Sequence, residues 1–187
     1  MSATTATKNE PAAPPDLVGG MLSAEEIRTL RRAYQTRESQ KFIHDAFASS
    51  LPQKYEKSKE YVDSIYDIFY GSLPPDIKTT RAALSVQDRE RCIIALLAAR
   101  GAGFNLGLHI YTALMEDVSP EEIANIILLA GVYTGVDNFS NGLNTLTETL
   151  GQLKQTLKGG NAPKGLKSSR PQVDAESIFK ALKNSLR

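Results

Sequence analysis

The apolar residues of one long segment in the second half of the chain recur at alternating steps of four and three. They are Phe139, Leu143, Leu146, Leu150, Leu153 and Leu157. A period near 3.5 residues returns each side chain to one face of a helix, so this spacing is typical of a helix packed along a narrow seam. The segment therefore predicts a helix over residues 139–157 whose seam binds a neighbouring helix or another subunit.

Two capping signals predict the starts of further helices. Ser23 and Glu26 form a capping box, in which each side chain bonds the other residue's amide, ahead of apolar residues at helical spacing. Ser119-Pro120-Glu121-Glu122 supplies an N-cap serine, a proline at the first helical position and a glutamate at the third. This second start predicts a helix that continues through IANIILLAGVYTG to Gly135.

Apolar stripes at helical spacing predict three more helices. The first is a short helix around residues 42–47, and the second covers about residues 58–70 and ends at Gly71 before a Pro-Pro break. The third is an amphipathic helix around Ile178, Leu182 and Leu186, whose partner is not evident from the sequence. Because no segment alternates with a period of two, the predicted fold is all-α.

The tails differ in composition from the centre of the chain. Residues 1–20 are rich in Ala, Thr and Pro and predict a disordered N-terminal tail, because they cannot bury enough surface to offset their ordering entropy. Residues 21–157 are expected to form a single folded domain, since 41% of the 187 residues are hydrophobic. Residues 158–187 are expected to form a basic linker followed by the C-terminal helix.

Charge and cysteine content exclude several classes of function. The 22 basic and 21 acidic residues nearly cancel, so nucleic acid and membrane partners are not expected. The single cysteine, Cys92, excludes an intrachain disulfide framework and a cysteine-based zinc site and is compatible with a reducing compartment. With no signal peptide or apolar span recognisable, we expect a cytoplasmic protein.

Two polar residues interrupt a predicted helical hairpin in the centre of the chain. The hairpin consists of a helix over about residues 86–100, a turn at Gly101-Ala102-Gly103 and a helix over about residues 104–115. Glu90 lies in the first turns of the first helix, where the helix dipole favours a carboxylate even without a functional role. His109 lies among apolar residues, which places its imidazole in a helix interface as either a structural core residue or a catalyst.

Helical geometry does not force these two residues together. With a rise of about 1.5 Å per residue, Glu90 lies roughly 16 Å before the turn and His109 roughly 9 Å after it. A bridging water, a bound substrate or a tilt between the helices would close the remaining offset, as is common in general acid-base sites. The sequence thus leaves open whether Glu90 and His109 form a chemical pair.

The stretch LSVQDRERCIIALLAARGAGFNLGLHIYTALMEDVSPEEIANIILLAGVYTGV, residues 84–136, resembles the carboxymuconolactone decarboxylase family, which includes the AhpD alkylhydroperoxidases. The matching elements are a leading Leu-Ser, a glutamate early in the first helix, a histidine nineteen positions later, V-S-x-E-E-I and a terminal Y-x-G-V. A looser likeness extends back to about residue 40 and forward to Leu150. The resemblance implies an AhpD-like all-α domain, assembled as a trimer or hexamer, whose active site is lined by the hairpin.

The chain departs from the peroxidase branch of this family at two positions. That branch has a C-x-x-C motif whose second cysteine stands four residues before the histidine, and here the two positions hold Ala102 and Asn105. Neither residue can form a thiolate. Cys92 has no second thiol, and burial within its apolar helix would leave it unreactive. Thiol-dependent peroxidase chemistry is therefore not expected.

The resemblance then implies the decarboxylase-like, cysteine-free branch, with Glu90 and His109 as the proton-transfer pair and with neither cofactor nor metal. Asn105, one turn before His109, is a candidate to hydrogen-bond a ligand, although capping of its own helix is the alternative. Tyr133 stands at the family's tyrosine and is a second candidate, or else a packed ring with a solvated hydroxyl. Arg100 is a candidate to neutralise a substrate carboxylate, or else complements its helix C-terminus.

The function expected from this resemblance is a lyase acting on a small carboxylated or enolisable cyclic substrate, in a homo-oligomer. Loss of carbon dioxide leaves an enolate, which needs a donor to its oxygen and an acid to protonate carbon. A biosynthetic isomerase or cyclase using the same residues is one alternative. A non-enzymatic binding or assembly protein is the other, because a fold does not fix a function.

Overall fold

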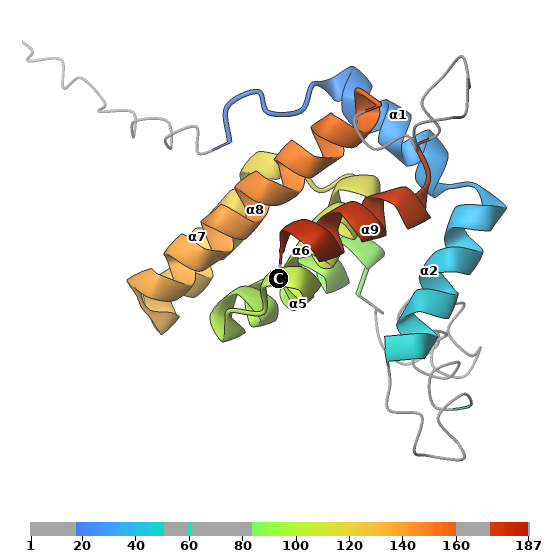
Figure 1. The fold of residues 1–187 in the computed structure, drawn as a ribbon. Helices are drawn as coiled ribbons and strands as arrows, with labels where there is room; N and C mark the ends of the chain where they lie inside the picture. Colours follow the sequence, from blue (N-terminus) through green and yellow to red (C-terminus); the bar gives the residue numbers. More distant parts are fainter. Residues whose placement is uncertain (1–17, 51–59, 61–83, 160–172, 187) are drawn as a thin grey trace, which may run out of the picture.

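The computed structural model describes residues 18–50, 60, 84–159 and 173–186, and these residues form helices without strands (Figure 1). The helices are α1 (Ala24–Tyr34), α2 (Arg37–Ser50), α5 (Val86–Arg100), α6 (Gly103–Met115), α7 (Pro120–Thr134), α8 (Val136–Leu157) and α9 (Ala175–Ser185). The predicted all-α fold is confirmed. The helix predicted over about residues 58–70 lies outside the described residues.

Both predicted capping signals are confirmed. At the start of α1, the Ser23 hydroxyl accepts from the Glu26 amide while the Glu26 carboxylate accepts from the Ser23 amide. At the start of α7, the Ser119 hydroxyl accepts from the Glu122 amide at 3.1 Å. The Glu122 carboxylate, however, pairs with Arg91 of α5 at 2.7 Å, so it joins the beginnings of α5 and α7.

The apolar seam of α8 lies in the core of the chain itself. Leu146, Leu150 and Leu153 are fully buried among apolar residues of α5, α6 and α7. Burying a leucine contributes about 1.5–3 kcal/mol, so this seam is a main source of stability. Of the two partners expected for this seam, the structure shows the first, because neighbouring helices of the same chain occupy it.

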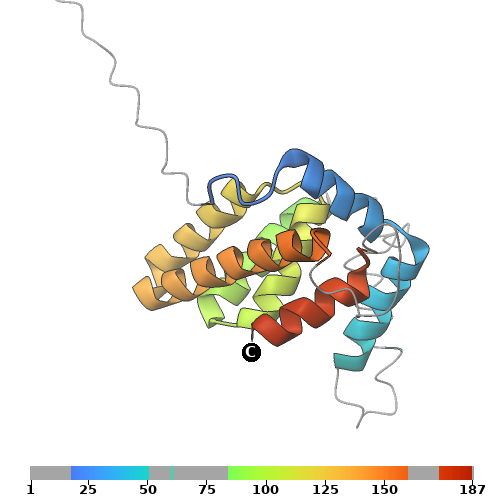
Figure 2. The same ribbon diagram turned by 45° about the horizontal axis from the view of Figure 1, so that its top comes forward.

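The C-terminal helix α9 has partners that the sequence did not reveal. It packs against α8, α2 and α6, and Figures 1 and 2 place it between the α8 side of the bundle and α2 at the edge. Ile178 and Leu182 are buried in the common core. The Ala175 amide also donates to the Ser39 hydroxyl of α2 at 3.3 Å. Although it follows residue 157, α9 thus belongs to the same packed unit as the helices before it.

The core also extends closer to the N-terminus than expected. Val18 is buried and belongs to the same core cluster as Leu22 and Leu30. Val18 therefore belongs to the core, although the composition of residues 1–20 had predicted a disordered tail.

A glycine permits the close approach of α6 and the end of α9. A Cβ atom added at Gly107 would lie 2.2 Å from Leu186 Cδ1 and 3.0 Å from the Thr149 hydroxyl of α8. Real Cβ atoms do not approach other atoms so closely, so only glycine fits without a shift of the neighbours. Gly107 therefore allows Leu186 to seat directly on the backbone of α6.

One face of the described structure exposes large apolar side chains. It lies on α7 and comprises Leu128, Leu129, Val132 and Tyr133, which we call the apolar face; Leu96 on α5 and Val136 at the start of α8 are also exposed. The α7 members follow helical spacing and so share one side of that helix. None of the described helices combines the length and apolar character needed to cross a membrane.

Candidate functional site

The hairpin of α5 and α6 forms at the predicted residues and supplies the frame of the candidate site. The Ser85 hydroxyl caps α5 by accepting from the Asp88 amide at 3.0 Å. The helix ends at Gly101, whose φ of 64° is the left-handed conformation that favours glycine. The chain then reverses, and α6 begins at Gly103. This short turn places α5 and α6 side by side.

Glu90 and His109 are in direct contact across the hairpin. His109 Nδ1 lies 2.9 Å from Glu90 Oε2, and only 1% of the Glu90 side chain is exposed. The axial offset estimated from the sequence is therefore closed without a bridging group. That estimate ignored the lengths of the two side chains and the tilt between the helices. The question left open by the sequence is answered: the two residues form a pair.

The contact with Glu90 determines which nitrogen of the neutral His109 ring carries the proton. An ionised carboxylate oxygen can only accept, so Nδ1 donates its proton to Glu90. In the neutral ring, Nε2 is then left as the acceptor. The His109 side chain is 25% exposed, whereas Glu90 is sealed inside. The buried residue therefore orients the ring, and the ring is the member of the pair that a ligand can reach.

The charge of Glu90 affects the pKa of a second carboxylate, Glu116. Burial raises the pKa of Glu116 above its ordinary value of 4.5, and the negative charges of Glu90 and Asp117 raise it further, against the opposing effect of Arg31 and Arg89. Glu116 follows His109 by seven residues at the end of α6, which is two helical turns. The region around Glu90 is therefore rich in negative charge.

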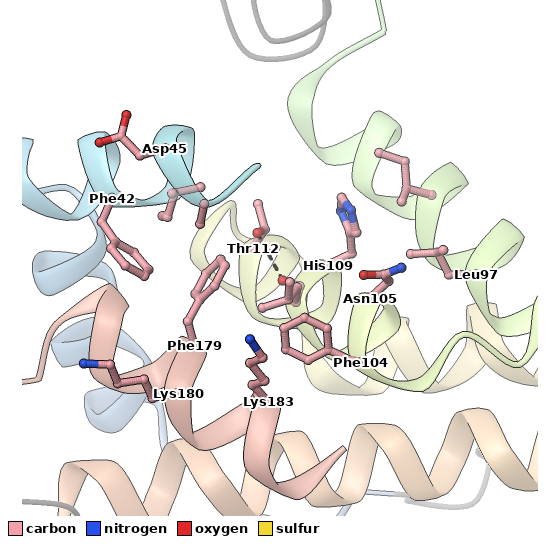
Figure 3. Close-up of a pocket in the computed structure, with 14 residues that line it drawn as sticks. Phe42, Asp45, Leu97, Phe104, Asn105, His109, Thr112, Phe179, Lys180 and Lys183 are labelled. Carbon is pink, nitrogen blue, oxygen red and sulfur yellow. Dashed lines mark hydrogen bonds between the residues drawn. The ribbon is translucent and has the colours of Figure 1, made fainter. Parts of the chain in front are cut away.

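His109 opens onto a cavity of about 780 Å³ between four helices. The walls come from α2, α5, α6 and α9 and are mostly apolar, with His109, Asn105 and Thr112 as polar groups on α6. The other lining residues are Phe42, Ile43, Asp45, Ala46, Ile93, Leu97, Phe104, Leu108, Phe179, Lys180 and Lys183. Figure 3 shows His109 and Asn105 on one side of this space and Lys183 of α9 on another. Its size is within the range of pockets for small organic ligands.

The three weaker candidates from the sequence lie in different places. Asn105 lines the cavity one turn before His109, as predicted. Tyr133 is 83% exposed on the apolar face and does not line this cavity, because the end of α7 points its side chain outward. Arg100 is exposed in the last turn of α5 and also lies outside the cavity lining. Its position matches the alternative reading, in which it complements the helix C-terminus.

Cys92 is exposed, contrary to the burial expected from its apolar neighbours. It faces away from the core because α5 buries Glu90, Ile94 and Ala98, which share the opposite side of the helix. The sequence still contains no second cysteine, so the paired-thiol reaction of the peroxidase branch has no partner thiol.

Several cavity residues were not predicted from the sequence. Thr112 follows His109 on the same side of α6, and that spacing could have indicated it. Phe179 and Lys183 come from α9, whose partner was unknown, so no local signal pointed to them. Within the described ranges, no group of three His, Cys, Asp or Glu side chains is arranged to hold a metal ion.

The Glu90–His109 contact predicts the tautomer of the neutral imidazole. In the wild type, the ring should carry its proton on Nδ1, and Glu90→Gln should raise the Nε2–H population because an amide can also donate to Nδ1. Proton–nitrogen correlation spectra of the histidine ring at alkaline pH measure these populations. Glu121→Gln, which changes an exposed residue on α7, serves as the control. Equal populations in the wild type and Glu90→Gln would contradict the pairing.

The raised pKa of Glu116 predicts a pH-dependent effect of Glu116→Gln. Because the folded state holds this proton more tightly than the unfolded state, the free energy of unfolding falls as pH rises from 4.5 through the raised pKa. The variant should therefore match the wild type below pH 4.5 and be more stable at pH 7. We expect a difference below about 1 kcal/mol, since the site is partly solvated. Urea unfolding at both pH values measures it, and a variant less stable at pH 7 than at pH 4 relative to wild type would contradict it.

Comparison with known proteins supports the assignment of this hairpin. Residues 76–148 match the carboxymuconolactone decarboxylase family, and this range includes both Glu90 and His109. Searches of curated proteins and of solved structures gave no match. The matched range covers the whole of α5, α6 and α7 and the first half of α8. Over residues 76–148, the chain is therefore similar to the carboxymuconolactone decarboxylase family, and its single cysteine is exposed.

Proposed function

We propose that this protein is a decarboxylase-like enzyme that uses Glu90 and His109 to transfer a proton to or from a carboxylated or enolisable substrate. The 2.9 Å contact between the His109 ring and a fully buried carboxylate, at the wall of a cavity, is the observation that supports this most directly. Buried ionisable pairs beside a cavity are typical of functional sites, although structural pairs also occur. The match of residues 76–148 to the family supports a decarboxylase-like activity in general terms.

In the proposed decarboxylation, the bond between the substrate's ring carbon and its carboxylate breaks. Its electron pair moves into the conjugated carbonyl, carbon dioxide leaves, and an enolate remains. Protonated His109 first donates a hydrogen bond to the enolate oxygen and then transfers its Nε2 proton to carbon, and solvent restores that proton. Glu90 is a positioning residue, because it holds Nδ1 and stabilises the imidazolium without reaching the cavity.

The same pair also suits an isomerisation, which is the alternative within the fold. Neutral His109 would remove a proton from the carbon beside a carbonyl and return it at another carbon of the same enolate. A non-enzymatic binding protein is the alternative from another class, and the apolar face is the observation that favours it. The single cysteine remains compatible with a reducing compartment for either function.

We expect the purified protein to convert some members of a panel of lactones and keto acids, with release of carbon dioxide or exchange of a carbon-bound proton for deuterium. His109→Ala should lower the rate at least about 100-fold, because it removes the acid-base group. Glu90→Gln should cause a smaller loss, because the ring remains while its orientation is relaxed. Carbon dioxide detection and proton NMR measure the two outcomes.

Glu121→Gln is the matched control for these variants, because it neutralises a glutamate outside the cavity lining. Circular dichroism establishes that each variant is folded. A wild type that converts no substrate, or a His109→Ala variant with full rate, would overturn the proposed mechanism.

We also propose that the protein is a homo-oligomer assembled through the apolar face. Among exposed side chains there, Val132 is 71% and Tyr133 is 83% accessible, and the α7 members recur at a helical spacing that places them on one side of the helix. Contiguous apolar surface of this kind commonly marks an interaction site. The family resemblance, which implies trimers or hexamers, makes a second copy of this chain the expected partner.

Val132→Glu should dissociate the oligomer, because it would place an unpaired charge in the buried interface. Size-exclusion chromatography with light scattering measures the mass. Leu84→Glu is the control, because Leu84 is also exposed but lies away from the apolar face. Leu84 precedes the beginning of α5, which Arg91 and Glu122 join to the beginning of α7, whereas Val132 lies near the end of α7. A monomeric wild type, or an unchanged mass for Val132→Glu, would count against this assembly.

A further inference from the structure

The cavity beside His109 is lined in a way that indicates the overall character of its ligand. Phe42, Phe104 and Phe179 contribute aromatic rings from three different helices, and Phe42 and Phe179 pack edge to face with their centroids 5.3 Å apart. Such a lining favours a flat or apolar molecular body. A volume of about 780 Å³ exceeds what a small lactone ring requires and suits a larger organic molecule.

Lys183 is the cationic group of this cavity whose charge is available to a ligand. Lys180, one turn earlier on α9, is paired with Glu176 at 2.6 Å, and Asp45 is paired with Lys41. No acidic side chain of the described residues pairs with Lys183. In Figure 3, the Lys183 ammonium group points toward the space between Phe104 and Phe179, while Lys180 points away from it.

The packing of α9 holds Lys183 in this position. Ile178 and Leu182 anchor the helix in the core, and Leu186, one turn after Lys183, seats on Gly107 of α6. Gly107 is itself two residues before His109 on the same helix. The cavity therefore has a cation on one wall and the proton-transfer group on another, on two helices that pack against each other.

We propose that Lys183 binds the carboxylate of a substrate with an aromatic or extended apolar body, and so selects acids larger than a small cyclic lactone. This inference rests on the proposed function, because it takes the cavity of His109 as the substrate site. The acid would lie with its body between the phenylalanine rings, a carboxylate that the reaction does not release at Lys183, and its reacting carbon at His109. An ammonium–carboxylate pair in this setting contributes affinity and fixes orientation.

The test compares 2-naphthoate with its neutral analogue 2-naphthamide, with affinities measured by isothermal titration calorimetry on the full chain. The wild type should bind the acid about tenfold more tightly than the amide, as expected for one charge-assisted contact. Lys183→Met should remove this preference, and Lys183→Arg should retain most of it. Lys180→Met is the matched control on the same helix and should keep the preference, because Glu176 already neutralises that charge.

Three results would overturn the inference: no binding of either probe, equal binding of acid and amide by the wild type, or an undiminished preference in Lys183→Met. His109→Ala separates this inference from the proposed function, because it removes the proton-transfer group and leaves Lys183, the carboxylate anchor, in place. If His109→Ala and the wild type both bind the acid preferentially while no substrate is converted, the function alone fails. If substrates are converted with equal efficiency by Lys183→Met, the anchor alone fails.

Discussion

The burial of the Glu90 carboxylate within the α5–α6 hairpin is the constraint on which the rest of the site depends. A charge removed from water requires a compensating partner, and His109 Nδ1 provides one at 2.9 Å. That contact fixes the orientation of the imidazole, and the ring's other side becomes available to the cavity. The nearby Glu116, whose pKa is raised by burial and by Glu90, is a further sign that negative charge is concentrated here against an electrostatic cost.

The architecture distributes the roles of anchoring and chemistry over different helices. The hairpin and α7, which fall within the family-matched residues 76–148, contribute the proton-transfer pair and its frame. The opposite walls of the cavity come from α2 and α9, which lie outside that range. The reactive pair and the surface that selects a ligand are therefore encoded by separate parts of the chain.

Most of the fold could be predicted because its signals are local. The capping serines Ser23 and Ser119, the glycine that ends α5 and the spacing of the α8 leucines each act within a few residues, and each element lies where the sequence indicated. What the leucines bind could not be predicted, because a buried seam and a subunit seam have the same period. The exposed apolar surface is on α7 instead, where leucine and valine lie beside buried isoleucines in one continuous apolar run.

The candidate site was predictable only in part, for a related reason. Glu90, His109 and Asn105 lie on one hairpin, so their order and spacing identify them together. Tyr133 and Arg100 have the right residue types for a site, but the directions of their side chains depend on how helices pack, which spacing does not specify. Lys183 is separated from His109 by more than seventy residues of chain, and only tertiary packing brings the two to the same cavity.

The packing of Leu186 against Gly107 affects how sequence variation in this protein should be interpreted. Gly107 is not itself among the residues that line the cavity, yet any side chain at this position must displace the Leu186 side chain, whose Cδ1 would lie 2.2 Å from an added Cβ. A substitution there would act on the packing of Leu186 and Thr149, which do not line the cavity, so a loss of binding caused by it would not identify Gly107 as a contact residue. The close packing of α6 against Leu186 at the end of α9 thus depends on a residue outside the cavity lining.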